Sequence, residues 1–393
     1  MGCPAPEHPS GPGGSGAELR VVDVLRRVGS SLLRSAPLGP EQRRLLYSIL
    51  ACRTPALGGQ VLLCPDCGHS KEVFHSCRNR HCPNCQAQAQ DKWIAARASS
   101  MLPVPHFHVV FTLPSELRGL CKKHPAALYA LLLRSSAETL MTLGSDTLAA
   151  QLGVTVVLHT WTRELKYHPH AHCIVSAGGW DRDAACFRKV RRKTFLFPVE
   201  RMKALFRARF LRGLRGLVQQ GVVALPGGVA FSAFERSLPK KRSWVVYAQA
   251  PFGRFEHVLS YLGRYTHRVG ISNSRLRAIT DEEVTFATKD GKTCTLTHQE
   301  FALRYLQHAL PDGFKKIRHY GLYASGSTQR KAALATLETG TTPTATGGPA
   351  GDAVEDDERE DEVWAERCCP HCAVPLVLVS DFPRPQRPPW RPP

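Results

Sequence analysis

The sequence predicts an α+β protein in which a cysteine-rich N-terminal module precedes a mainly antiparallel sheet with flanking helices. Two C-x-x-C motifs within residues 64–85 mark the module, and this stretch has few hydrophobic residues of its own. After Pro105, short β-branched runs alternate with apolar stretches of helical period. Strands and helices in such an order are typical of α+β domains.

Apolar residues recur at helical spacing in several parts of the chain. The first helical stretch covers residues 17–51 and is interrupted by a Pro/Gly break near residue 38. The other predicted helices cover residues 86–102, 126–144 and 199–221, and the last of them is rich in arginine. The predicted strands cover residues 106–114, 154–162, 171–177 and 243–251.

Composition predicts five segments along the chain. The Pro/Gly-rich start and the Gly/Thr-rich, then acidic, stretch near the end have too few hydrophobic residues to form a core. We therefore expect a disordered leader (1–17), a helical and cysteine-rich domain (18–100), the sheet domain (101–323), a disordered acidic linker (324–362) and a short cysteine-containing tail (363–393).

The charge of the chain points to a polyanionic partner. The formal net charge is +19, and the sequence pI is about 9.6. Nucleic acid is the usual partner of such a protein, although a solvated basic surface has the same composition. We expect no membrane segment, because the chain has no long apolar run. The fourteen cysteines occur partly in C-x-x-C pairs and follow no secretory signal, which favours metal binding in a reducing cytoplasm over disulfides.

The two C-x-x-C pairs predict a structural zinc site. Cys64 and Cys67 form one knuckle, and Cys82 and Cys85 form the other. Two such pairs close a tetrahedral Zn²⁺ site, and the metal would stabilise a segment that lacks a hydrophobic core. Cys77 and His81, in the loop between the pairs, are alternative ligands or could bind a second ion.

A late cysteine pair forms half of a zinc site. Cys369 and Cys372 have the same C-x-x-C spacing, with Cys368 and His371 beside them. The sequence does not indicate their partners.

Three histidines alternate along residues 167–175, YHPHAHCIV. In an extended strand His170 and His172 share one face, and Ala171 faces the core. Two imidazoles on one strand face can chelate a divalent ion, although surface histidines are the simpler explanation of this stretch alone. His168 has the same parity but precedes a proline, so it is only a candidate third ligand, as is Glu164.

A second His-x-His motif, at His106 and His108, has no further feature in its flanks. We expect it to be an ordinary strand of the core sheet.

Two tyrosines lie four residues apart in YLGRYTHRVGISNSRL. Tyr261 and Tyr265 would share one helical face. A tyrosine hydroxyl can attack a phosphate that a metal ion polarises, and a covalent phosphotyrosine results. Without the histidines, half-buried aromatic residues on a helix would explain the pair equally well.

These parts, in this order, resemble the rolling-circle transposases of the HUH class, specifically the two-tyrosine insertion-sequence group typified by the IS-ninety-one element. The resemblance covers residues 17–323. It rests on CPDCG…SCRNRHCPNCQ, HFHVVFTLP, YHPHAHCIVSAGG, WVVYAQAPFG and YLGRYTHRVGISNSRL. It implies a zinc-ribbon-like N-terminal module and an HUH endonuclease palm. The family usually has a bulkier residue than Ala171 between the two histidines.

The resemblance also implies roles for individual residues. His170 and His172 would hold Mg²⁺ or Mn²⁺, and Tyr261 and Tyr265 would be the candidate nucleophiles. Tyr265 would be the principal one, because relatives with a single tyrosine align it with the second of the pair. The residues expected to contact DNA phosphates are Arg78, Arg80, Arg264, Arg268, Lys240 and Lys241, together with the arginine-rich helix.

The resemblance implies a cytoplasmic, nucleoid-associated bacterial enzyme that cleaves and rejoins single-stranded DNA at element ends and target sites. Host replication machinery would be an indirect partner. Two rivals stay open. A histidine-triad nucleotide hydrolase, with His170 as nucleophile, fits the letters HPHAHCIV, and a catalytically inactive zinc-dependent DNA-binding protein fits the cysteines and the charge.

Overall fold

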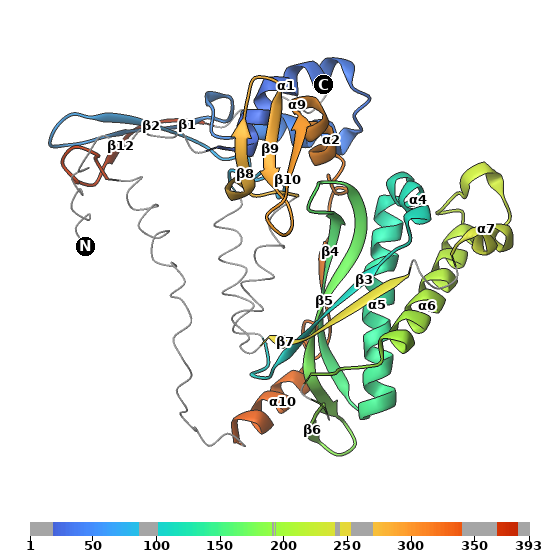
Figure 1. Ribbon diagram of the computed structural model, residues 1–393. Coiled ribbons are helices and arrows are strands. Elements are labelled where there is room, and N and C mark those ends of the chain that lie inside the picture. The colour runs from blue at the N-terminus through green and yellow to red at the C-terminus, as the bar shows by residue number, and fades with distance from the viewer. Residues whose placement is uncertain are drawn as a thin grey trace.

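The computed structural model describes residues 19–85, 101–190, 192, 194–239, 244–252, 270–339 and 368–383. It confirms an α+β architecture with antiparallel sheets (Figure 1). Within these ranges no helix combines the length and the apolar character that crossing a membrane would require.

A mainly antiparallel sheet forms the centre of the larger part of the molecule. Its strand order is β11-β4-β5-β3-β7, and β6 pairs with the far end of β5. All four predicted strands are confirmed, as β3, β4, β5 and β7. The strands are β3 (His106–Thr112), β4 (Gln151–Trp161), β5 (Tyr167–Asp181), β6 (Cys186–Lys189), β7 (Val245–Phe252) and β11 (Ile317–Gly321).

Two long helices cover one face of this sheet (Figure 1). They are α5 (Pro125–Leu148) and α6 (Val199–Gln219), and both were predicted. The apolar side of α6 packs into the core, where Phe206 and Phe210 are fully buried against Trp244. Short elements flank these helices, namely η2 (Ser115–Leu117), α4 (Arg118–Lys123), η3 (Pro226–Gly228) and α7 (Phe231–Ser237).

A second core joins the N-terminal helices to a late segment of the chain. The predicted break near residue 38 separates α1 from α2 as expected. Both helices pack against α9, where Phe301 and Tyr305 are fully buried. The domain boundaries stay predictions. The packing of α1 and α2 against α9 joins segments on either side of the predicted boundary at residue 100. The elements involved are α1 (Val21–Ser35), α2 (Pro40–Ala51), η4 (Asn273–Arg275), β8 (Leu276–Ile279), β9 (Glu283–Ala287), β10 (Thr293–Thr297) and α9 (His298–Leu306).

A small three-stranded sheet extends from the N-terminal part, with strand order β12-β1-β2 (Figure 1). The hairpin of β1 (Gly59–Leu63) and β2 (Ser70–Phe74) follows the 3₁₀ turn η1 (Pro55–Leu57). The third strand, β12 (Val377–Phe382), comes from the predicted tail and pairs with β1 in antiparallel orientation.

The predicted disordered linker at 324–362 is wrong for its first part. Helix α10 (Thr328–Thr339) lies there, because Ala333 and Leu337 pack against Trp180 and Tyr323 at the end of the central sheet. The leader and the acidic run lie outside the described residues, as does the predicted helix at 86–102 except for its last two positions.

Candidate metal centres

Three histidines meet on the face of the central sheet that α5 and α6 leave uncovered. His170 and His172 lie on β5, and the antiparallel register places His159 of β4 directly opposite His170. One nitrogen atom from each of the three imidazoles lies within 4.8 Å of the others. Ala171 is fully buried in the core on the opposite face, as predicted.

His159 is the third member of this cluster, where the sequence predicted His168 or Glu164 as the third ligand. The ring of His168 turns to Arg118, whose Nη2 lies 2.8 Å from its Nδ1. The carboxylate of Glu164 forms an ion pair with Lys166, with 2.5 Å between Oε2 and Nζ. His159 is buried and stacks on Trp161, with 4.9 Å between ring centroids.

Hydrogen bonds fix which nitrogen of His170 and His172 carries a lone pair. Nδ1 of His170 lies 2.6 Å from the carbonyl oxygen of His168, so Nδ1 donates and Nε2 is the basic nitrogen. Nδ1 of His172 lies 2.8 Å from Nε2 of His108, and Nδ1 of His108 lies 3.3 Å from Oε1 of Gln249. Because an amide oxygen only accepts, His108 donates to Gln249 and accepts from His172. Nε2 of His172 is therefore basic as well.

Burial keeps these imidazoles neutral near pH 7. It lowers the pKa of His170 to about 4 and holds the pKa values of His159 and His172 well below the ordinary value. Neutral imidazole is the form that binds a metal ion. Three converging neutral imidazoles are a donor set that could hold one divalent transition metal.

The interpretation of His106 and His108 as an ordinary core strand is half right. His106 is buried and its Nε2 lies 2.5 Å from the hydroxyl of Tyr323, which is a structural contact. His108, however, orients His172. Sequence inspection missed this role because the contact joins two strands more than sixty residues apart.

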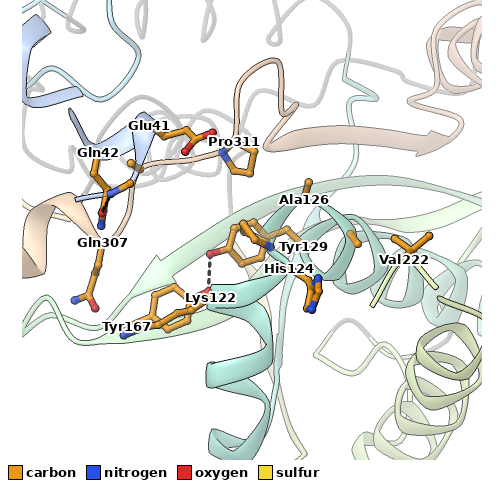
Figure 2. Close-up of a pocket in the computed structure, with 14 residues that line it drawn as sticks. Glu41, Gln42, Lys122, His124, Ala126, Tyr129, Tyr167, Val222, Gln307 and Pro311 are labelled. Atoms are coloured by element: carbon orange, nitrogen blue, oxygen red, sulfur yellow. Dashed lines mark hydrogen bonds between the residues drawn. The ribbon is translucent and has the colours of Figure 1, made fainter. Parts of the chain in front are cut away.

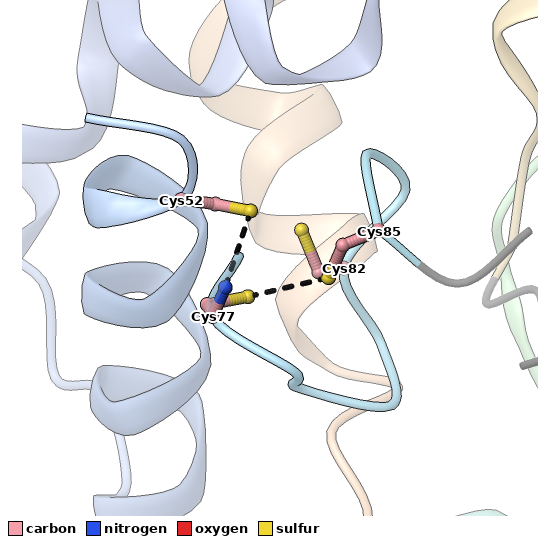
Figure 3. Close-up of side chains that lie close together, drawn as sticks. All are labelled: Cys52, Cys77, Cys82 and Cys85. Atoms are coloured by element: carbon pink, nitrogen blue, oxygen red, sulfur yellow. Dashed lines mark hydrogen bonds between the residues drawn. The ribbon is translucent and has the colours of Figure 1, made fainter. Parts of the chain in front are cut away.

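Four cysteines gather where α2 ends (Figure 3). Cys52 caps that helix, and Cys77, Cys82 and Cys85 come from the loop after β2. Their sulfur atoms lie within 4.8 Å of one another, and Cys77 and Cys85 are 3.7 Å apart. Cys52, Cys77 and Cys82 are buried. This group could hold a tetrahedral Zn²⁺ ion.

The predicted grouping of Cys64 and Cys67 with Cys82 and Cys85 is corrected by this arrangement. Cys64 and Cys67 sit at the tip of the β1–β2 hairpin, whereas the loop of Cys82 follows its base. A five-residue strand spans about 16 Å, and a Zn–S bond is about 2.3 Å, so one ion cannot reach both. The tip cysteines instead meet Cys369 and Cys372.

The remaining predicted ligand and two predicted DNA contacts have different surroundings. His81 is buried, hydrogen-bonded to Asn79 and to the amide of Leu310, and belongs to no cysteine group. The guanidinium of Arg80 donates to the carbonyls of Pro311 and Phe314 and stabilises the fold. Arg78 is exposed.

Helix α6 lies on the face opposite the histidines, and several of its arginines pair with acidic side chains. Arg201 pairs with Asp146, and Arg209 pairs with Glu138. The position of α6 does not support its predicted contact with DNA. The other predicted site residues lie outside the described residues: Tyr261, Tyr265, Arg264, Arg268, Lys240 and Lys241.

A separate cavity of about 540 Å³ lies between the start of α2 and the start of α5 (Figure 2). At its wall the hydroxyls of Tyr129 and Tyr167 are 2.6 Å apart, and Lys122 lies over the Tyr167 ring. Tyr167 belongs to the core on the helix-covered face of the sheet, and none of the three clustered histidines lines this cavity.

Comparison with known proteins identifies the family. Residues 153–332 match the family described as "Putative transposase", and residues 24–113 match the "Transposase zinc-binding domain". The "Putative transposase y4qJ" of Sinorhizobium fredii is 41% identical over 328 residues, which cover 80% of this chain and 82% of the relative. The chain belongs to this transposase family.

A second relative of the transposase is the "Transposase for insertion sequence element IS801" of Pseudomonas savastanoi pv. phaseolicola. It is 28% identical over 324 residues, covering 78% of this chain and 76% of the relative. None of the solved structures matches. The predicted resemblance to insertion-sequence transposases is thereby confirmed, as is a zinc-binding domain near the N-terminus.

The matched regions contain the two sites described above. The zinc-binding region of the transposase includes Cys52, Cys77, Cys82 and Cys85, and the second region includes all three clustered histidines. Cys369 and Cys372 lie outside both. Cys52 belongs to no C-x-x-C motif, and His159 precedes His170 by eleven residues. Only the folded structure shows that these two residues belong to the sites.

Proposed function

We propose that the transposase cleaves and rejoins single-stranded DNA through a covalent 5′-phosphotyrosine, for rolling-circle transposition of an insertion sequence. The observation that carries the proposal is the convergence of His159, His170 and His172 on the face of the antiparallel sheet opposite α5 and α6. In the HUH class that the sequence resembles, such a sheet is the palm of the nuclease. A metal-binding face and a tyrosine pair are the two halves of one active site in this proposal.

The donor set fits a divalent ion. His159, His170 and His172 would hold it, and when bound it would polarise a scissile phosphate as a Lewis acid. Three imidazoles suit Mn²⁺ better than Mg²⁺, which prefers oxygen ligands. The hydrogen bonds from His170 to the His168 carbonyl and from His172 to His108 make Nε2 the basic nitrogen of each ring.

The tyrosines would carry the covalent step. The hydroxyl oxygen of Tyr265 attacks phosphorus, and the bond from phosphorus to the 3′ oxygen breaks. The tyrosine loses its proton and the 3′ oxygen gains one, leaving a 5′-phosphotyrosine and a free 3′-OH that host polymerase can extend. The new ester conserves the energy of the broken bond, so strand transfer needs no ATP. Tyr261 would take the second strand or resolve the first.

The rival functions are weaker. A histidine-triad hydrolase would not explain the cysteine groups, and membership of the transposase family argues against this function. An inactive DNA-binding protein would bind single strands without forming an adduct, which makes it an outcome of the test below. We further propose a cytoplasmic, nucleoid-associated location, with single-stranded DNA at element ends and target sites as partner.

The test is adduct formation on a denaturing gel with a labelled single-stranded element end, with and without Mn²⁺. Wild type should give a Mn²⁺-dependent adduct, and both His170→Ala and Tyr265→Phe should reduce it at least a hundredfold. Tyr320→Phe, a change on the helix-covered side of β11, serves as the control and should keep it. A normal adduct from Tyr265→Phe would falsify the assignment of the principal nucleophile.

A further inference from the structure

Two pairs of cysteines that are about three hundred residues apart in sequence converge at the tip of the β1–β2 hairpin. Cys64 and Cys67 form the turn of the hairpin, and Cys369 and Cys372 precede β12. The four sulfur atoms lie within 4.8 Å of one another. Figure 1 shows the corresponding contact of the C-terminal strand with the hairpin.

The sulfur–sulfur distances are too long for disulfide bonds and are close to those of sulfurs that share one metal ion. Cys64 and Cys372 are 3.2 Å apart, Cys67 and Cys369 are 3.4 Å apart, and Cys67 and Cys372 are 3.8 Å apart. A disulfide bond would require about 2.05 Å. Four sulfurs around one Zn²⁺ at about 2.3 Å form a tetrahedron with edges of about 3.8 Å.

Both C-x-x-C turns also have the same backbone structure. In the first, the amide of Gly68 donates to the carbonyl of Cys64, and the amide of Cys64 donates to His69. In the second, the amide of Ala373 donates to the carbonyl of Cys369, and the amide of Cys369 donates to Val374.

The residue after each turn adopts a left-handed conformation, with φ of 71° at Gly68 and 54° at Ala373. Alanine rarely adopts this conformation, so the second turn maintains a locally unfavourable shape that matches the first.

The small sheet has little else to stabilise it. Among the described residues, no member of β1, β2 or β12 belongs to a hydrophobic cluster. Val377, Leu378 and Val379 of β12 are all more than half exposed. A sheet of this size without a buried face needs a further source of stability, which a structural metal can supply.

We infer that Cys64, Cys67, Cys369 and Cys372 bind a second structural Zn²⁺, which fastens the C-terminal strand to the N-terminal zinc-binding domain. The cysteine groups of the chain then bind two zinc ions, the first through Cys52, Cys77, Cys82 and Cys85. The second ion closes a loop of about three hundred residues, and its loss releases β12 from β1. This inference does not depend on the proposed catalytic chemistry.

Metal content of the full chain, purified under reducing conditions, tests the stoichiometry. Wild type should contain one zinc ion per chain more than the double variant Cys369→Ser/Cys372→Ser, whether or not the histidine cluster also holds zinc. The control Cys186→Ser/Cys294→Ser removes two half-buried cysteines outside both groups and should retain the zinc content of wild type. Equal zinc in wild type and the Cys369/Cys372 variant overturns the inference. Hydrogen exchange at residues 59–63 should rise in that variant, while β3 to β5 stay protected.

Alkylation of the wild-type chain provides a test that does not require a variant to fold. Cys67 and Cys372 are exposed, yet as zinc ligands they should resist iodoacetamide until a chelator is added, and then react at least tenfold faster. Cys186 should react at one rate throughout. Equal alkylation of Cys67 and Cys372 with and without chelator overturns the inference, as does recovery of these cysteines in disulfides from the reduced preparation.

Discussion

At the residue scale, His159 is the side chain that completes the histidine cluster. It lies directly across from His170 in the β4–β5 register, and its ring centroid is 4.0 Å from that of His172. Replacing it with alanine removes one of three imidazoles that could hold the ion. We expect His159→Ala to weaken Mn²⁺ binding at least tenfold, measured by calorimetry, and to reduce adduct formation in parallel.

The matched control is His168→Ala, because His168 lies on the same strand but its ring is engaged by Arg118. This variant should bind Mn²⁺ within about twofold of wild type. If His168→Ala lost the ion and His159→Ala kept it, the identity of the third ligand would be wrong. Circular dichroism should show that both chains are folded.

Sequence predicted the part of this cluster that lies on one strand. Alternation placed His170 and His172 on one face and Ala171 on the other, because side-chain direction in a strand depends only on parity. His159 and His108 depend on which strands become neighbours and in which register, and no local pattern encodes that. The cysteines show the same limit, since Cys64 and Cys82 have the right spacing but lie at opposite ends of a hairpin.

At the scale of elements, prediction succeeded where a segment has a strong period of its own. The apolar face of α6 and the β-branched run of β4 both determine their structure locally. The segment from β8 to α9 and the helix α10 were not predicted. These elements are short, and their apolar residues become buried only against partners distant in sequence, such as Phe301 against α1 and α2.

The edge strand β7 provides an element-scale prediction about DNA binding. In the sheet register Tyr247 of β7 and His172 of β5 both lie opposite Val110 of β3. The ring of Tyr247 therefore lies on the histidine face, and the residue is 53% exposed. Aromatic side chains on such faces stack with bases of single strands, worth about 1–3 kcal/mol for each base. Tyr247→Ala should therefore weaken single-stranded DNA binding by roughly 5- to 150-fold in fluorescence anisotropy at constant salt.

Two companion variants determine whether stacking is the cause. Tyr247→Phe keeps the ring and should bind within about twofold of wild type. Val379→Ala removes a similarly exposed apolar side chain from β12, away from the histidine face, and should have no effect. Equal binding by Tyr247→Ala and wild type would show that nucleic acid does not pass over this edge.

At the scale of the whole molecule, buried neutral histidines link stability to pH. Burial lowers the pKa of His106 to about 4 and of His308 to about 3, and it holds that of His81 well below the ordinary value. In the unfolded chain these groups titrate near 6.5. Below that pH the unfolded state binds more protons than the folded state, so the free energy of unfolding falls as the solution becomes more acidic.

The contribution of His106 to this pH dependence can be measured separately, because His106 lies outside both cysteine groups and the histidine cluster. Between pH 7 and pH 5 its titration should lower the free energy of unfolding by about 2 kcal/mol. His106→Gln keeps a hydrogen-bonding side chain but cannot be protonated, so its stability should fall by about 2 kcal/mol less than that of wild type over this interval. Urea denaturation at the two pH values, with zinc present throughout, measures the difference. Since loss of zinc in acid affects both chains alike, equal losses of stability would mean that His106 is protonated as readily in the folded chain as in the unfolded one.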